Sequence, residues 1–321
     1  MKAQTIAVTL ALLLSVAGCG SSSSTVGALP GSVAPQGASS GHHLVTKTRV
    51  VSVKRSVETG LRGKKELIGG VFALLLDLLD APWVGGDNSS QVNLALVGIN
   101  VLSNGVATPV VVNSSELVVN LLSLQGVAQQ YAANLPAGSY DTLQLVVDPS
   151  NSNVVFGGVT YPVQFGSLPN DPTSYVGIDA PATFTAVDAS NVAVTADFNV
   201  LESVAITNSV ALIDPQLVIA TNASDVTGSV LNAAGGPVAN AVVLALDPNG
   251  NILNSTVTAN DGSFTLEALG AGSASIVVQN SYVSASGETV AASGADAGAS
   301  PTPLPIAVTG GNTINIGSLT D

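Results

Sequence analysis

Apolar residues recur at every second position along much of this chain, which is the spacing of a β-strand with one buried face. In the stretch 92–97, the residues Val92, Leu94 and Leu96 alternate with Asn93, Ala95 and Val97. Asn104 and Gly105 follow, a pair that favours a two-residue hairpin turn because both residues tolerate positive φ. The pattern therefore predicts antiparallel sheet. Further strands are expected at 110–112, 154–156, 159–163, 182–187, 192–200 and 210–220.

A turn at 135–140 is expected to start another strand, which would carry Leu143, Leu145 and Val147 on one face and stop at Asp148-Pro149. Two stretches lack the alternation. The apolar run 68–76, ended by Asp80-Ala81-Pro82, predicts a strand buried on both faces, with a short helix as the open alternative. Residues 121–134 have apolar residues at helical spacing and predict one helix before Pro136.

The strand pattern restarts at Asp225 and continues to the end of the chain. Strands are expected at 226–230, 241–246, 264–266 and 312–319, separated by turns at 235–238, 247–250 and 260–263. Residues 281–303 are rich in Ala, Ser and Gly and predict an inserted loop. Two units of this kind predict two sandwich domains.

The first 19 residues resemble the signal of a bacterial lipoprotein. Lys2 precedes an apolar run from Ile6 to Ala17 that is too short to cross a bilayer as a permanent helix. Val16-Ala17-Gly18-Cys19 resembles the lipobox, which implies that Cys19 becomes the acylated first residue and anchors the protein in a membrane. Gly20, in place of Asp, favours the outer membrane within that resemblance. The alternative is an ordinary signal peptide with a spare thiol.

We therefore expect an all-β fold with two antiparallel β-sandwich domains in tandem and one short helix in the first domain. The predicted divisions are a signal peptide at 1–18, a flexible and partly basic tether at 19–65, and sandwiches at 66–221 and 222–321. Cys19 is the only cysteine, so no internal disulfide can form, and the fold must depend on burial.

Ordered motifs in the first sandwich resemble the family called domain of unknown function 4382. They are Asp80-Ala81-Pro82, the turn 135–140, Ala196-Asp197-Phe198 and Ile213-Asp214-Pro215. The resemblance implies a β-sandwich found in bacterial lipoproteins, without assigned catalytic residues. The family commonly has an Arg where this chain has Gln144 and an acid where it has Asn199, which implies that a family salt bridge is missing here.

The second sandwich resembles the carboxypeptidase regulatory-like domain, a small transthyretin-like sandwich. The resemblance rests on Val226-Thr227-Gly228-Ser229-Val230, the turn Gly235-Gly236-Pro237-Val238 and the turn Asn260-Asp261-Gly262-Ser263. It implies a structural and binding accessory without peptidase chemistry.

Charge is divided sharply along the chain. All eight Lys and Arg residues lie at or before Lys65, whereas only Glu58 and Glu66 of the 21 acids precede residue 67, which leaves 19 acids beyond them. The body from residue 67 should therefore form no internal salt bridge. It should also repel nucleic acid, whose phosphates require Lys and Arg.

The basic segment from Lys47 to Lys65 has two interpretations. It is a solvated linker, or it binds anionic lipid headgroups next to the anchor, each basic residue adding about 1 kcal/mol. His42 and His43 are the only histidines, and we interpret them as linker residues because no further metal ligand lies nearby in the sequence.

The body contains no His, Cys, Lys or Arg, so it lacks the side chains of most nucleophilic and zinc-dependent sites. We predict no catalytic, cofactor or metal site. Only carboxylate pairs remain, such as Asp77 with Asp80 or Asp197 with Glu202, which we interpret as strand-end and turn residues. No EF-hand calcium loop is present.

We interpret the chain as a lipid-anchored structural or binding module of the cell envelope that is not an enzyme. Carbohydrate binding is the main alternative, with Trp83 stacking on a sugar ring if it is exposed and capping a sheet if it is not. A glycan or an envelope protein is the expected partner. A carboxylate-based hydrolase is a further alternative.

The excess of acids predicts an unusual dependence of stability on pH. Repulsion among carboxylates raises their pKa values in the folded state, so their contribution to stability is present at low pH and is lost as the pH rises through those values. The melting temperature should hold or rise on acidification from about pH 7 to about pH 4. A steep fall over this range in thermal denaturation would contradict the prediction.

Overall fold

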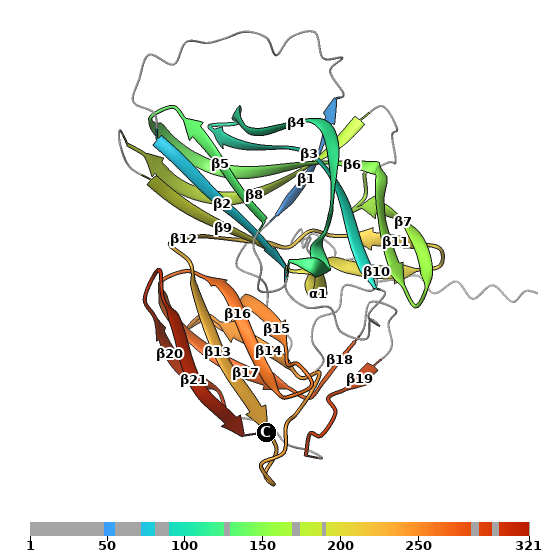
Figure 1. Cartoon of the computed structure of the whole chain (residues 1–321), viewed down its shortest axis with the longest axis vertical. Coiled ribbons are helices and arrows are strands. Elements are labelled where there is room, and N and C mark those ends of the chain that lie inside the picture. Colours follow the sequence, from blue (N-terminus) through green and yellow to red (C-terminus); the bar gives the residue numbers. More distant parts are fainter. Residues whose placement is uncertain are drawn as a thin grey trace, which may run out of the picture.

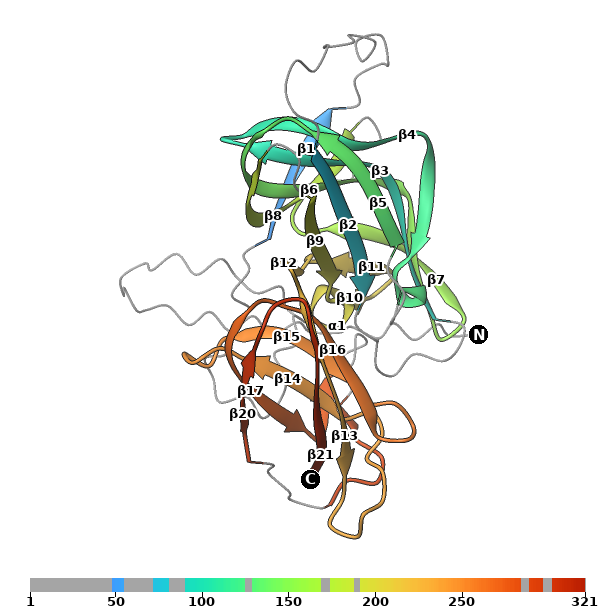
Figure 2. The ribbon, with the colours of Figure 1, turned by 60° about the vertical axis from the view of Figure 1, so that its left-hand side comes forward.

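The computed structural model describes residues 48–54, 72–80, 90–124, 129–168, 174–187, 191–283, 289–296 and 302–320. Two β-rich domains follow one another along the long axis (Figure 1), and a view turned by 60° shows the same separation (Figure 2). The all-β prediction is confirmed. Among the described residues, no helix has the length and hydropathy needed to cross a bilayer.

The first domain is built from two sheets. In the larger one, β1 (Arg49–Lys54), β8 (Ser174–Ala186), β6 (Gly138–Phe156), β7 (Val159–Phe165), β11 (Val210–Ile213) and β10 (Val204–Thr207) pair in this order, and β3 (Gln91–Ser103) pairs with β6 and with β4 (Val106–Asn120). The smaller sheet has the order β12 (Leu217–Thr221), β9 (Asn191–Phe198), β2 (Phe72–Asp80) and β5 (Gln129–Leu135). Most pairs are antiparallel, but β2 with β9 and β7 with β11 are parallel.

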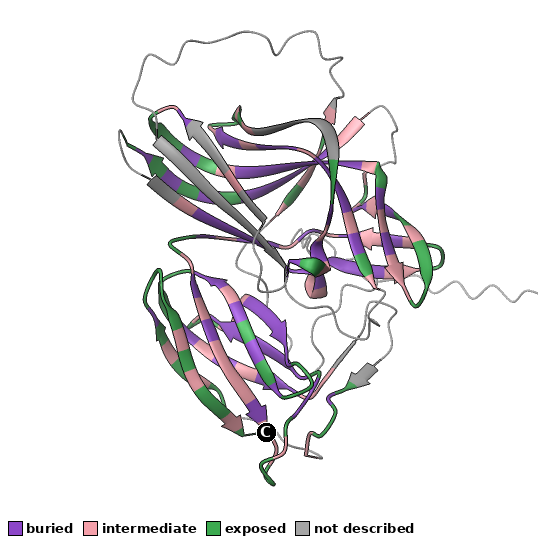
Figure 3. Cartoon of the chain, in the orientation of Figure 1, coloured by how far each residue is buried: buried purple, intermediate pink, exposed green. Residues whose placement is uncertain are grey.

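The core of this domain follows from the predicted alternation. Ile99 pairs with Leu145 and Leu145 pairs with Ile178, so that three buried side chains form a row across β3, β6 and β8. Figure 3 shows buried positions along these central strands. The predicted hairpin is confirmed at Asn104 and Gly105, which have φ of 51° and 78°.

The strand through Leu143, Leu145 and Val147 is confirmed, but the prediction that Asp148-Pro149 ends it is wrong. β6 continues to Phe156 through a bulge. Asp148 Oδ1 accepts the backbone N–H of Ser150 at 2.9 Å, and the Ser152 hydroxyl donates to the Asp148 carbonyl at 2.7 Å. These local bonds satisfy backbone groups that the Pro would otherwise leave unpaired.

The helix predicted at 121–134 is also wrong. The chain forms a 3-10 turn, η1 (Leu121–Ser123), and then strand β5, which pairs with β2 from Phe72↔Leu135 to Leu78↔Gln129. Residues 125–128 lie outside the described part. Pairing with β2 outweighs a short helical pattern because isolated helices of this length are marginal. The short helix of this domain is instead α1 (Val200–Ser203).

The second domain also contains two packed sheets. One has the order β16 (Ser263–Leu269), β13 (Ser224–Leu231) and β21 (Thr313–Thr320), and the other has the order β15 (Ile252–Val257), β14 (Val242–Leu246), β17 (Gly272–Gln279) and β20 (Leu304–Val308). The predicted last strand is confirmed as β21, which runs parallel to β13. The predicted loop 281–303 includes a short hairpin, β18 (Ser281–Val283) with β19 (Thr289–Ala291).

The segment predicted as a flexible tether contains a paired strand. β1 lies within 19–65, yet it pairs with β8 over six residues, from Arg49↔Asp179 to Lys54↔Ser174. Gly177 makes room for it, because a Cβ there would lie 2.8 Å from Val51 Cγ2. The part of the tether from Arg49 to Lys54 is therefore part of the first domain, which corrects the predicted boundary.

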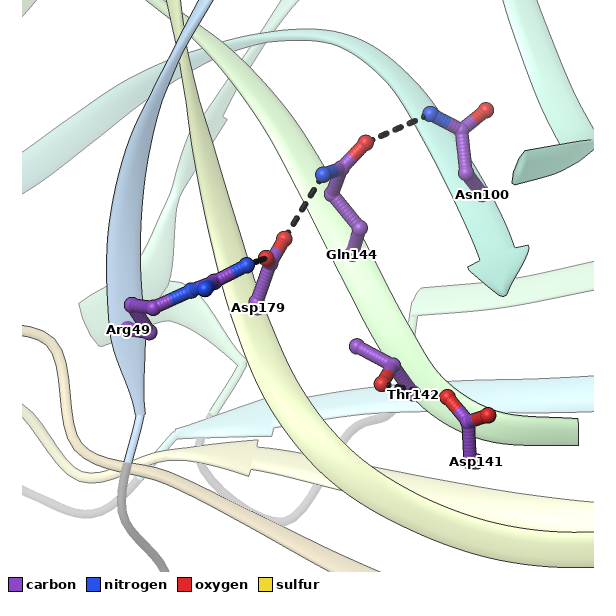
Figure 4. A network of polar contacts seen from close by, with 6 residues as sticks. All are labelled: Arg49, Asn100, Asp141, Thr142, Gln144 and Asp179. Atoms are coloured by element: carbon purple, nitrogen blue, oxygen red, sulfur yellow. Dashed lines mark hydrogen bonds and ion pairs between the residues drawn. The ribbon is translucent and has the colours of Figure 1, made fainter. Parts of the chain in front are cut away.

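β1 also brings a cation to the body from outside it, and so supplies an ion pair that the body, with no Lys or Arg beyond Lys65, could not form from its own residues. The Arg49 guanidinium lies 3.1 Å from Asp179 Oδ2, and the Gln144 amide donates to Asp179 Oδ1 at 2.6 Å. Asn100 donates to Gln144 at 2.8 Å and extends the network across four strands (Figure 4). A side chain from the tether thus compensates a buried carboxylate of the sheet.

We predict that Arg49→Ala lowers the free energy of unfolding by about 1 kcal/mol, because Arg49 is 76% exposed and an exposed ion pair contributes little. Chemical denaturation of the full chain measures the change. Ser52→Ala, an exposed position on the same strand, is the matched control and should leave stability unchanged. An equal loss in both variants would mean that the strand, not the ion pair, determines the effect.

Candidate functional site

The residues singled out from the sequence differ in what the structure says of them. Cys19, Trp83 and the two histidines lie outside the described residues. Asp77 and Asp80 lie on β2, where the backbone but not the side chains is described. Asp197 and Glu202 are described, and both lie where the first domain meets the second. We take this junction as the candidate site.

The turn from β9 into α1 places the polar groups of the first domain. Asp197 is in the last two residues of β9, and Asn199 caps α1 by accepting the Glu202 N–H at 3.2 Å. The Ser203 hydroxyl donates to the Asn199 carbonyl at 2.5 Å, and the Asn199 N–H donates to the Gln216 carbonyl at 2.9 Å. The Asn199 side chain is therefore held with its amide free to reach the neighbouring domain.

Strand β15 of the second domain supplies the partners. The Asn254 amide donates to Asp197 Oδ2 at 2.6 Å and to the Glu267 carbonyl at 2.7 Å. The Asn199 amide donates to Asn254 Oδ1 at 3.2 Å and to the Ser255 hydroxyl at 2.7 Å. The four side chains in this network, those of Asp197, Asn199, Asn254 and Ser255, are all buried. Glu267 contributes only its backbone carbonyl. A continuous buried network thus joins the two domains.

Apolar contacts surround this network. Leu201 of α1 packs against a cluster on the second domain that consists of Val242, Leu244, Leu246, Ile252 and Val257. Strand β16 contacts both β9 and β12. Figure 1 shows α1 at the boundary between the two domains. The junction therefore combines apolar packing with specific hydrogen bonds, as a stable interface does.

Burial changes the acid chemistry of the junction. Burial raises the pKa of Asp197 to about 6, against the hydrogen bond from Asn254, which lowers it, and with a smaller increase from the charge of Asp225. Burial also raises the pKa of Glu202 to about 7 and raises the pKa of Asp214 and of Asp225. Asp197 Oδ1 is buried and has no hydrogen-bond partner. The two acids with the largest shifts, Asp197 and Glu202, therefore titrate close to neutral pH.

Acids elsewhere titrate in the opposite direction. The backbone N–H of Asn104 lowers the pKa of Asp141, the side chain of Asn251 lowers that of Asp247, and the side chain of Ser263 lowers that of Asp261. Their contribution to stability is lost only as the pH falls through these lowered values. Between pH 7 and pH 4, the acids that titrate are those of the junction, whose pKa values are raised. The main cause of the increase is burial, whereas we expected repulsion among carboxylates.

The geometry argues against Asp197 acting on a substrate. Its side chain is 1% exposed and its Oδ2 is bound by Asn254, so a bond to be cleaved has no access to it. Paired catalytic carboxylates must flank a substrate in a cleft. Within the described ranges, no group of three His, Cys, Asp or Glu side chains is placed to hold a metal ion. The arrangement holds two domains together.

The two positions where the chain departs from the family that its first sandwich resembles lie in separate networks. Gln144 bonds to Asp179 and Asn100 in the larger sheet, whereas Asn199 bonds to Asn254 and Ser255 at the junction. Gln144 and Asn199 therefore do not bond to each other in place of the salt bridge that the resemblance implies for these two positions. Asn254 and Ser255 were missed by the sequence analysis. Their signal was an Asn-Ser-Thr run inside an otherwise apolar strand, at 252–257.

Comparisons with protein families confirm both resemblances. Residues 73–213 match the family described as domain of unknown function (DUF4382), and residues 225–302 match the family described as carboxypeptidase regulatory-like domain. The two matches have the predicted order along the chain. A search of curated proteins finds no match.

Three solved structures illustrate the remaining similarity. The Bacillus anthracis TIE protein is 12% identical with a TM-score of 0.23, and the alignment covers 78% of this chain and 41% of that one, so this chain spans less than half its length. BcpA, the major pilin subunit of Bacillus cereus, is 9% identical with a TM-score of 0.23, covering 86% and 71% of the two chains. GBS52, the minor pilin of Streptococcus agalactiae, is 12% identical with a TM-score of 0.23, covering 78% and 96%. TM-scores this low assign no function.

We predict that Asn254→Ala lowers the free energy of unfolding by about 2 kcal/mol at pH 8, because it leaves the buried Asp197 carboxylate without its donor. The loss should be smaller at pH 5, where Asp197 is largely protonated. Denaturant titrations at both pH values measure it.

Asn249→Ala is the matched control, because Asn249 is exposed in the neighbouring turn and its side chain makes only a 3.4 Å contact with Asp247. This variant should lose little stability and show no dependence on pH. An equal loss at pH 5 and pH 8 in Asn254→Ala would mean that the ionised Asp197 is not the group left without a partner.

Proposed function

For a chain that carries a DUF4382 domain followed by a carboxypeptidase regulatory-like domain, we propose a lipid-anchored structural or binding module of the cell envelope, without catalysis. The observation that carries the proposal is the domain junction. Its one fully buried acid, Asp197, is bonded across the junction to Asn254 and cannot meet a substrate. The carboxypeptidase regulatory-like family in the chain is non-catalytic in kind, which supports the proposal.

The way the chain enters the first domain supports a role as a tethered body. Thr48 precedes β1, and its hydroxyl accepts the Leu217 N–H at 3.1 Å, while β1 pairs with β8. The start of the described chain is therefore fixed to β8 of the larger sheet and to β12 of the smaller one. A load applied to an anchor at Cys19 would pass through β1 into both sheets and then across the junction to the second domain.

The chemistry of the N-terminus supports the anchor. Val16-Ala17-Gly18-Cys19 has the small residues that lipoprotein processing requires, and 29 residues separate Cys19 from Arg49. A segment of this length made mainly of Ser, Gly, Ala and Pro reaches well beyond a headgroup layer. In this proposal Cys19 fixes the protein to the membrane, and the two domains present a surface to a glycan or to another envelope protein.

The test is metabolic labelling with radioactive palmitate in cells that express the full chain. The wild-type protein should carry the label and sediment with membranes, whereas Cys19→Ala should carry no label, because no other thiol exists. Ser21→Ala is the matched control and should be labelled like the wild type. An unlabelled wild-type protein, or a labelled Cys19→Ala variant, would contradict the proposal.

A further inference from the structure

We propose that the junction between the two domains is a proton-controlled latch, which closes more tightly in acid and loosens as Asp197 ionises. It rests on the two-domain body of the proposed function but not on the lipid anchor. The candidate latch consists of Asp197, Asn199, Asn254 and Ser255, with Glu202 beside it on α1.

The first argument is the geometry of Asp197. Oδ2 accepts the Asn254 amide at 2.6 Å across the junction, whereas Oδ1 is buried and has no hydrogen-bond partner. A carboxylate with one unsatisfied buried oxygen is costly when charged, and it loses much of that cost when it is protonated. Separation of the domains would return the group to water, so charge on Asp197 favours the open arrangement and a proton favours the closed one.

The second argument is that the described elements around Asp197 carry no basic side chain that could neutralise its charge. The sequence has no Lys or Arg beyond Lys65 and no His beyond His43, so none of β9, α1, β12, β13, β15 and β16 carries a base. The titratable residues on elements against β9 are acids: Asp225 on β13, Glu267 on β16, and Asp77 and Asp80 on β2. Among the described elements packed against Asp197, an added proton is therefore the one route to a neutral side chain.

The third argument is that the latch lies at the only covalent passage between the domains. β12 ends at Thr221 and β13 begins at Ser224, so two residues join the first domain to the second. α1 presents Leu201 to the apolar cluster of the second domain while Asn199 at its start reaches Ser255. Loosening of the hydrogen bonds at Asn254 therefore frees the contact next to a short connection, which can act as a hinge.

The direction of the effect follows from the titration of the buried group. The closed junction holds Asp197 with a pKa of about 6, and an open junction returns it toward its ordinary value of 3.8. The opening equilibrium therefore increases about tenfold per pH unit between those values and levels off above the higher one. Glu202 lies on α1 at the same junction and burial raises its pKa to about 7, so its titration is tested together with that of Asp197.

Hydrogen exchange on the purified full chain tests the latch. After correction for the intrinsic pH dependence of exchange, the amides of β15 and of residues 199–203 should exchange at least tenfold more slowly at pH 5 than at pH 7.5. The amides of the β3 and β6 core should change far less, because the latch opens without unfolding the first domain.

Asp197→Asn is the decisive variant, because an amide keeps an oxygen for Asn254 and removes the titration. It should reduce the pH effect about tenfold, and the double variant with Glu202→Gln should exchange slowly at both pH values. Asp141→Asn is the matched control, since Asp141 is exposed, lies outside the junction and has a lowered pKa. It should behave like the wild type.

Three results would overturn the latch. The first is an unchanged pH effect in Asp197→Asn, and the second is a loss of the pH effect in Asp141→Asn as large as that in Asp197→Asn. The third is that calcium chloride slows exchange of the wild type at pH 7.5 but not that of Asp197→Asn, which would make the junction a cation site. If Asp197→Asn does not fold, Asp225→Asn replaces it. Removal of that neighbouring charge should move the midpoint of the wild-type exchange profile to lower pH, and an unmoved midpoint would count against the latch. Palmitate labelling at Cys19 is unaffected by any of these outcomes.

Discussion

The contact on which the two-domain arrangement depends is a hydrogen bond from Asn254 to Asp197, a carboxylate with no cation among the described residues around it. Asp197 is fully buried between domains in a body whose remaining elements contain acids and no bases. Proteins usually bury a carboxylate beside Arg or Lys. Here a single amide, that of Asn254, takes that place, and burial raises the pKa of Asp197 to about 6. A junction built in this way is specific in geometry and sensitive to acidity.

The same shortage of bases explains the role of β1. Asp179 is 9% exposed in the larger sheet and has Gln144 as a neutral donor, and the one guanidinium that reaches it comes from Arg49 in the N-terminal segment. The chain thus uses two solutions to the problem of a buried acid. At the sheet a strand carries in a cation, and at the junction a side-chain amide is supplied by the other domain.

Under the proposed anchoring at Cys19, both solutions have a mechanical consequence. The N-terminal segment is paired with the sheet and bonded through Thr48 to the opposite sheet, and the first domain is bonded to the second through Asn199 and Asp197. Load would reach the second domain through the junction bonds of Asn199 and Asp197, and protonation of Asp197 acts on the same network. A body of this kind suits a role in spacing or holding at an envelope better than a role in chemistry.

The sequence by itself determined the all-β class, the hairpin at Asn104-Gly105, the order of the two domains and the lack of basic side chains, because alternation, turn residues and composition are local properties. It misjudged the helix at 121–134 and the strand end at Asp148-Pro149, where pairing with distant strands outweighs local preference. Only the tertiary structure decided that Arg49 meets Asp179 and that Asp197, Asn199, Asn254 and Ser255 form one buried network. These partners are 55 to 130 residues apart, and nothing in the local pattern specifies contacts over such separations.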